Sequence, residues 1–208
     1  MSYTGKPGRV IVLNGPSSSG KSTFCKALQS LLLETRGESW WHVQMDAFAA
    51  MLPALPPPDW AKTDPADVGR FLSGWYGCIR ALALAGNDVI AEAGFLEMDW
   101  LLEQIEALDG IEALYVGVFC PLEEVERREI KRGDRAIGYS RGQYDRVHLH
   151  GPYDVEVDTS ILGPEEVAQV IKAALDTPPA PSAFRRIWGD REPALKPSRS
   201  ASAGPACP

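Results

Sequence analysis

Eight residues near the N-terminus carry the clearest chemistry in this sequence. Residues 15–22 read Gly-Pro-Ser-Ser-Ser-Gly-Lys-Ser, and only Asn14 separates them from the apolar run Val10–Leu13. A strand, then G-x-x-x-x-G-K-[ST], then a helix is the pattern of a phosphate-binding loop, and this context argues against a chance Gly/Ser-rich turn. Small residues let consecutive backbone N–H groups point at one anion, and the following helix adds its positive end. We predict nucleotide contacts from Gly15, Pro16, Ser17, Ser18, Ser19, Gly20, Lys21, Ser22 and Thr23.

Two side chains of this loop have expected roles in catalysis. Lys21 should reach the β- and γ-phosphates of ATP, and the Ser22 hydroxyl should hold Mg²⁺. Glu92 follows the expected strand 88–91 and is a second candidate for orienting Mg²⁺ or its waters. The alternative for Glu92 is a buried carboxylate that accepts hydrogen bonds from backbone N–H groups.

Asp46 is the candidate catalytic base. It ends the expected strand 41–45, beside the phosphate loop, where an acceptor hydroxyl would have to lie. Phosphoryl transfer needs a group that orients this hydroxyl and takes its proton late, and a carboxylate can do both. The alternative is an N-cap for a short helix over 47–52, a role that Asp often has.

Two arginines beyond the expected helix 122–131 are candidate lid residues. Arg132 and Arg135 flank Gly-Asp, and such a pair could close over a triphosphate and neutralise developing charge. The lid would cover about residues 127–150. The other cations of this helix are interpreted as a solvated face paired with Glu123, Glu124 and Glu126; they are Arg127, Arg128 and Lys131.

Helical and strand patterns alternate along the chain. This alternation predicts an α/β fold with a doubly wound, mostly parallel five-stranded sheet, of the phosphate-loop kinase type. In such sheets the active site lies at the carboxyl ends of the strands, where Gly15, Asp46 and Glu92 would meet. The remaining predicted elements are helices over 21–33, 67–85 and 99–108, a strand over 113–119, a helical stretch up to His150, an edge strand over 153–158 and a last helix from Pro164.

Several histidines and aromatic residues are weaker candidates. His148 and His150 form an H-x-H pair without a third ligand at metal spacing, so we interpret them as structural or surface residues. Trp75 lies on an apolar helix stripe and is expected in the core. Phe48, Trp60 and Phe95 lie near strand ends or in the proline-rich stretch 53–65, where they could line a substrate pocket.

Composition limits the class of protein. The 208 residues suffice for one α/β domain, and no run of about 18 apolar residues predicts a membrane span. We expect no signal peptide, and the scattered cysteines fit a reducing cytoplasm. The net charge of −7 argues against a nucleic-acid-binding protein and disfavours a polynucleotide kinase.

The last 32 residues differ in composition from the rest. Residues 177–208 hold 7 of the 17 prolines and a net charge of +3, from five basic and two acidic side chains. We expect a kinase domain over 1–176 and a disordered tail over 177–208, whose removal should change little. One apolar cluster, Phe184, Ile187 and Trp188, is the exception that could dock on the domain.

The motifs together resemble the chloramphenicol phosphotransferase family. The resemblance covers about residues 10–175 and rests on the phosphate loop, Asp46, the stretch 132–135 and the stretch 153–159. It implies an ATP-dependent O-phosphotransferase in which Asp46 is the base, Lys21 and Ser22 serve phosphate and Mg²⁺, and Arg132 and Arg135 belong to the lid. The chain departs from the family at two positions. The family's enzyme has Gly where Pro16 stands here, and it has a second acidic residue directly after the position of Glu92, which this chain lacks.

The expected function is therefore transfer of a phosphoryl group from ATP to a hydroxyl of a small molecule. An antibiotic such as chloramphenicol is the leading acceptor. A metabolite, sugar or nucleoside kinase of the same fold is one alternative, and a non-catalytic nucleotide-binding regulatory module is another. A protein that only binds a nucleotide has no need of a base such as Asp46 beside the γ-phosphate. This residue therefore distinguishes an enzyme from a binding module.

Overall fold

The computed structural model describes residues 5–52, 63–133 and 136–189. Five strands form one parallel sheet in the order β2-β3-β1-β4-β5, which confirms the predicted fold class. The strands are β1 (Val10–Asn14), β2 (Trp40–Gln44), β3 (Asp88–Ala93), β4 (Ala113–Phe119) and β5 (Val155–Asp158). Because β1 has β3 on one side and β4 on the other, the chain changes direction at β1, and such a switch point opens a crevice at the carboxyl ends.

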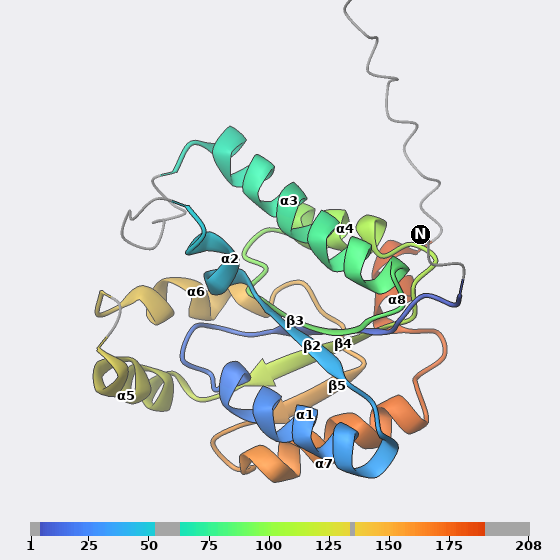
Figure 1. The fold of residues 1–208 in the computed structure, drawn as a ribbon. Helices are drawn as coiled ribbons and strands as arrows, with labels where there is room; N and C mark the ends of the chain where they lie inside the picture. The colour runs from blue at the N-terminus through green and yellow to red at the C-terminus, as the bar shows by residue number, and fades with distance from the viewer. Residues whose placement is uncertain (1–4, 53–62, 134–135, 190–208) are drawn as a thin grey trace, which may run out of the picture.

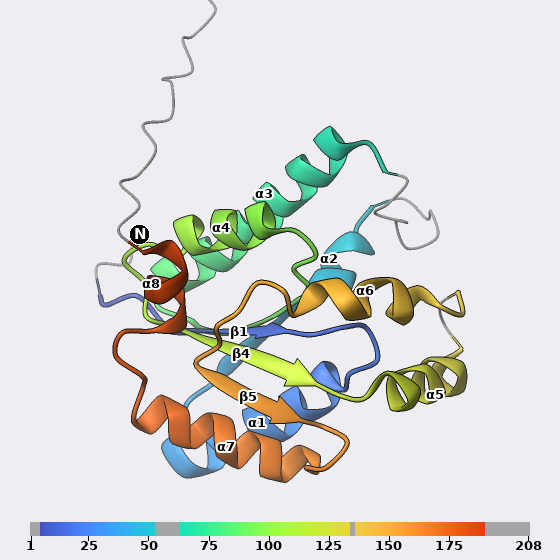
Figure 2. The same ribbon diagram turned by 180° about the vertical axis from the view of Figure 1, so that it is seen from behind.

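Helices cover both faces of the sheet (Figures 1 and 2). One face carries α1 (Lys21–Arg36) and α7 (Pro164–Asp176), and the other carries α3 (Pro65–Leu84), α4 (Met98–Ala107) and α8 (Ala183–Trp188). Three further helices lie at the carboxyl end of the sheet: α2 (Met45–Ala49), α5 (Leu122–Arg132) and α6 (Tyr139–Val147). No helix within the described ranges is long and apolar enough to cross a membrane.

Each face of the sheet has its own hydrophobic core. Strand β1 is buried along its whole length and supplies both cores, with Ile11 and Leu13 facing α1 and α7, and Val10 and Val12 facing α3 and α4. Continuous apolar strands of this kind are expected when helices cover a parallel sheet on both sides. Trp75 is fully buried in the second core, as predicted.

Helix boundaries differ from the prediction by a few residues. Helix α1 continues to Arg36, where Gly37 takes the left-handed conformation and caps it, and α3 begins at Pro65 with Asp64 as its N-cap. Strand β2 ends at Gln44, so Asp46 lies in the first turn of α2 rather than at the end of the strand.

The prediction of disorder beyond residue 176 is wrong for the part that the structure describes, 177–189. Helix α8 packs in the core of the α3–α4 face, where Ala183 is fully buried and Phe184 is 6% exposed. The centroids of the Phe184 and Tyr115 rings lie 5.0 Å apart. Asp154 accepts a hydrogen bond from the Ala183 N–H at 2.5 Å. Composition misled here because three apolar side chains suffice to dock one short helix. Residues 190–208 lie outside the described residues.

Candidate active site

The phosphate loop has the backbone shape that its sequence predicts. Gly20 (φ 95°) and Ser18 (φ 62°) take the left-handed conformation and turn the chain inward. A Cβ on Gly15 would lie 2.5 Å from the carbonyl oxygen of Val118, so only glycine fits between β1 and β4. The hydroxyls of Ser18 and Ser19 are buried and have no hydrogen-bond partner in the described part of the chain. Buried polar groups normally have hydrogen-bond partners, so these two serine hydroxyls fit a loop that binds a polar ligand.

Lys21 lies folded over the start of this loop. Its Nζ donates hydrogen bonds to the carbonyl oxygens of Gly15, at 2.7 Å, and Pro16, at 2.8 Å. The ammonium group lines a cavity of about 660 Å³ at the carboxyl end of the sheet. A cation held over backbone carbonyls can exchange them for phosphate oxygens when an anion enters.

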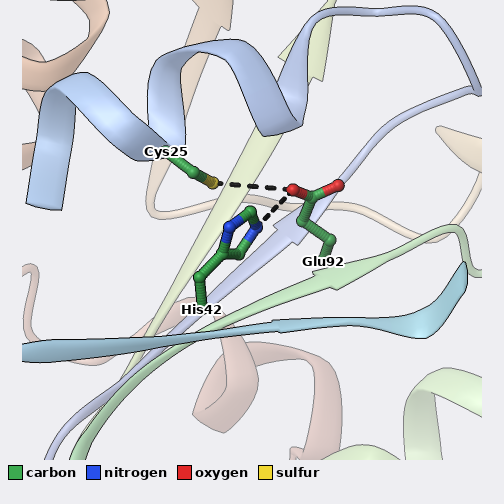
Figure 3. Close-up of side chains that lie close together, drawn as sticks. All are labelled: Cys25, His42 and Glu92. Atoms are coloured by element: carbon green, nitrogen blue, oxygen red, sulfur yellow. Dashed lines mark hydrogen bonds and ion pairs between the residues drawn. The ribbon is translucent and has the colours of Figure 1, made fainter. Parts of the chain in front are cut away.

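Glu92 and Ser22 both line this cavity, and Figure 3 shows Glu92 with its neighbours His42 and Cys25. Ser22 Oγ donates to Glu92 Oε2 at 2.9 Å, while the other carboxylate oxygen, Oε1, contacts His42 Nε2 and lies 3.7 Å from Cys25 Sγ. Gln44 Nε2 also donates to Oε1, at 3.3 Å. Glu92 is therefore a buried carboxylate, as in the alternative interpretation, but its partners here are side chains rather than backbone N–H groups.

Glu92 remains an anion despite its burial. Burial alone would raise its pKa, but the hydrogen bond from His42 and the positive charge of Lys21 outweigh it, and the pKa is lowered. Because a carboxylate can only accept, His42 Nε2 must carry the proton of their contact. The ligand atoms of Cys25, His42 and Glu92 lie within 4.8 Å of one another. We attribute this closeness to hydrogen bonds that converge on Oε1 and turn Oε2 toward Ser22.

Asp46 lines the same cavity from helix α2. It is exposed in the first turn of α2, and the N-cap of that helix is Gln44, so Asp46 does not have the capping role of the alternative interpretation. The apolar side chains of Met45, Leu72, Leu96 and Trp100 line the same cavity. The structure thus brings Asp46 of α2, Lys21 and Ser22 of α1, and Glu92 of β3 to one cavity from three separate elements.

The predicted pocket aromatics lie elsewhere. Phe95 is fully buried and packs on Tyr115 in the core, at 6.2 Å between ring centroids. Phe48 packs against Phe71 of α3 and is not among the cavity residues. Trp60 lies outside the described residues. The aromatic residues that do line the cavity are Phe24, Trp100 and Tyr139, and of these Trp100, near the start of α4, carries no distinctive sequence signal.

Helices α5 and α6 occupy most of residues 127–150, the stretch for which a lid is predicted. Arg132, the last residue of α5, is exposed and lines the cavity, whereas Arg135 lies outside the described residues. Glu129 is only 3% exposed and accepts hydrogen bonds from the N–H groups of Gly138 and Ser140, so it joins α5 to the start of α6.

Sequence reasoning missed Arg128 as a site residue. It pairs with Glu124 as expected, but its guanidinium also donates to Thr159 Oγ1 at 3.0 Å, to the Thr159 carbonyl at 2.9 Å and to the Ser19 carbonyl at 3.4 Å. It therefore links α5, the loop after β5 and the phosphate loop. The available signal was its spacing: Arg128 and Arg132 lie four residues apart and share one face of α5.

His148 is structural, which agrees with the prediction. Its ring stacks on Phe119 with 4.0 Å between centroids, and Nδ1 lies 2.8 Å from the hydroxyl of Tyr153. Burial, and then the charge of Lys21, lowers its pKa to about 4. The imidazole is therefore neutral near pH 7.

Comparison with known proteins points in the same direction as this geometry. The sequence profile of the family described as "Chloramphenicol phosphotransferase-like protein" matches residues 8–176. Two curated proteins from strains of Mycobacterium tuberculosis, both called "Putative O-phosphotransferase", are 31% identical over 201 residues, covering 86% of this chain and 88% of theirs.

Solved structures share the fold at lower identity. The APS kinase CysC of Mycobacterium tuberculosis, in complex with AMPPNP and APS, has a TM-score of 0.67 and 21% identity over 83% of this chain and 100% of its own. Shikimate kinase from Acinetobacter baumannii, in complex with shikimate, has a TM-score of 0.60 and 16% identity over 82% and 94%. Both support the kinase-type α/β fold described above.

Proposed function

Because the chain belongs to the chloramphenicol phosphotransferase-like family, we propose that it transfers the γ-phosphoryl group of ATP to a hydroxyl of a small molecule. One observation carries this proposal: Lys21 of the phosphate loop and the exposed carboxylate of Asp46 line one cavity of about 660 Å³. A site for nucleotide binding alone has no use for a carboxylate on the wall facing the phosphates. Asp46 therefore favours an enzyme over a regulatory binding module.

In the proposed reaction, Asp46 orients the acceptor hydroxyl and takes its proton late. The acceptor oxygen forms a bond to the γ-phosphorus while the bond to the β–γ bridging oxygen breaks, which leaves ADP. Lys21 binds the phosphate oxygens, and Arg132 adds positive charge from the lid side of the cavity. Both cations act where negative charge spreads in the transition state.

The residues around Ser22 fit magnesium. The Ser22 hydroxyl and the Glu92 carboxylate are hard oxygen donors 2.9 Å apart at the cavity edge, the ligand type that Mg²⁺ prefers. We propose that these two residues hold the ion, directly or through its waters. Bound Mg²⁺ supplies charge neutralisation to the β- and γ-phosphate oxygens.

The acceptor wall favours a neutral, partly apolar molecule. Met45, Leu72, Leu96 and Trp100 line the cavity together with Asp46, and the cations that line it, Lys21, Arg128 and Arg132, come from the phosphate loop and α5. An anionic acceptor would need a cation near Asp46. We therefore propose an aromatic, hydroxylated antibiotic such as chloramphenicol as the first acceptor to test. The free thiols of Cys25, Cys78 and Cys120 fit a reducing cytoplasm as the place of this reaction.

The proposal is tested by measuring ADP release with Mg-ATP over a panel of acceptors. The panel contains chloramphenicol, a second neutral hydroxylated antibiotic, a sugar, a nucleoside and an anionic hydroxy acid. We expect release to rise above the acceptor-free rate with a neutral aromatic alcohol and to stay low with the hydroxy acid. Release with the sugar or nucleoside alone would change the acceptor class, and no acceptor-dependent release in a protein that binds ATP would favour the binding module.

A further inference from the structure

Gln143 connects the lid to the phosphate loop. Its Oε1 accepts a hydrogen bond from the backbone N–H of Ser17 at 2.8 Å, across 126 residues of sequence. Since an N–H can only donate, the atom that faces it must be the oxygen of the carboxamide, and this fixes the orientation of the side chain. A polar group of α6 thus lies against one of the amides of the loop.

This contact is at the end of the loop where the terminal phosphates belong. Lys21 Nζ lies on the carbonyl oxygens of Gly15 and Pro16, the two residues directly before Ser17. The lysine of such a loop serves the β- and γ-phosphates, so the loop next to its Nζ is the β/γ end.

Helix α6 is fixed at both ends, so the position of Gln143 is well defined. At the start, Glu129 accepts from the N–H and hydroxyl of Ser140, each at 2.7 Å. At the end, Asn14 Nδ2 donates to the carbonyl of Val147 at 2.7 Å. Ser140, Gln143 and Val147 are three and four residues apart, and such spacing places them on one face of a helix, here the face toward β1 and the loop.

The other half of the carboxamide is the group of interest. With Oε1 engaged by Ser17, the Nε2 amide keeps two N–H donors, and the side chain lines the cavity together with Lys21 and Arg132. We propose that Gln143 is a catalytic residue that donates from Nε2 to the γ-phosphoryl group of bound ATP while Oε1 stays on Ser17. The lid would then recognise the nucleotide by its third phosphate. This inference rests on the proposed function, because it assumes that ATP occupies the loop.

Binding measurements with two nucleotides test this assignment without relying on turnover. We expect Gln143→Ala to weaken a non-hydrolysable ATP analogue by about 10- to 100-fold, the range for one hydrogen bond to a charged group, and to leave ADP affinity unchanged. Gln143→Glu keeps an acceptor for the Ser17 N–H but removes the donor, so it should weaken the analogue at least as much. Asp145→Asn, on the exposed face of α6, is the matched control and should change neither affinity.

Each other result overturns the assignment. If Gln143→Glu binds the analogue as the parent does, the side chain only ties α6 to the loop. If Gln143→Ala binds either nucleotide more tightly, the carboxamide competes with phosphate for the Ser17 amide. Equal losses for ADP and the analogue would exclude a contact specific to the third phosphate. A parent protein that binds neither nucleotide would overturn the proposed function as well, so the two failures are distinguishable.

Discussion

The ammonium group of Lys21 lies 2.7 Å from the carbonyl oxygen of Gly15, the first residue of its own phosphate loop. Its positive charge also acts on two other side chains. Burial and the charge of Lys21 lower the pKa of His148. The hydrogen bond from His42 and the charge of Lys21 lower the pKa of Glu92, although burial would raise it. One side chain therefore fixes the loop and sets the electrostatics of the site. This makes Lys21 the first position to test.

Lys21→Ala should lose both ATP affinity and turnover while the fold remains. The side chain is partly exposed at the cavity and is not part of either core, so its removal should cost little stability. Lys26→Ala, an exposed lysine one turn further along α1, is the matched control. Calorimetric ATP titration and thermal melting check both points. A folded Lys21→Ala protein with parental activity would contradict the loop assignment.

Asp46→Asn should keep nucleotide affinity and lose turnover by about 10²- to 10⁴-fold, the usual contribution of a general base. The amide preserves the shape of the side chain but cannot take the hydroxyl proton. Steady-state rates at saturating ATP, with the acceptor varied, measure this effect, and Asp109→Asn serves as a control on an exposed turn. A loss confined to ATP binding would place Asp46 on the nucleotide side.

Arg132→Ala should lower kcat more than it weakens ATP binding, because negative charge on the transferring group is greatest in the transition state. Arg127→Ala is a suitable comparison: it lies on the same helix and pairs with Glu124, but does not line the cavity. Paired measurements of kcat and ATP affinity decide the matter. Equal behaviour of the two variants would reduce Arg132 to a surface residue.

His148 should make the domain less stable as the pH falls. Its folded pKa of about 4 lies below the ordinary histidine pKa of 6.5, so between these values only the unfolded chain takes up the proton. Stability due to His148 is complete above pH 6.5, is lost as the pH falls toward about 4, and then levels off. His148→Gln keeps a polar partner for Tyr153 and should flatten this part of the melting-temperature profile. Superimposable profiles would show that His148 is not responsible.

Helix α8 should contribute to stability. Phe184→Ala removes a buried ring from the core and should cost about 3 kcal/mol, or about 6–12 °C in melting temperature. Arg185→Ala, an exposed neighbour, is the control. A chain that ends at Asp176 should melt below one that ends at Gly189, since only the latter keeps the contacts of Phe184 and Ala183. Equal melting of these two chains would restore the original expectation for this segment.

The fold could be predicted from the sequence because its signals are local and repeated. The apolar run of β1, the loop pattern and the alternation of strands and helices each follow from neighbouring residues. The meeting of Gly15, Asp46 and Glu92 followed from topology alone, since parallel strands bring their carboxyl ends to one edge. Strand ends are harder to predict: β2 stops at Gln44, so Asp46 lies in the first turn of α2 and not at the end of the strand.

The missed residues act through contacts that no local pattern encodes. Arg128 has the spacing of a surface ion pair with Glu124, and only the packing of α5 brings it to Thr159 and Ser19. Gln143 reaches Ser17 across 126 residues. Helix α8 was overlooked because its proline-rich surroundings resemble a linker, while its contacts with β4 and α4, among them Phe184 on Tyr115, exist only in the folded chain.

The fate of labelled phosphate tests the central claim most directly. The protein is incubated with Mg²⁺, chloramphenicol and ATP carrying a radioactive γ-phosphate, beside the Asp46→Asn and Lys26→Ala variants. We predict that the label moves to the antibiotic, or to another neutral hydroxylated acceptor of the panel, in the parent and Lys26→Ala, and not in Asp46→Asn. Label that appears only as inorganic phosphate, or that stays in ATP with every acceptor, would contradict transfer to a hydroxyl group.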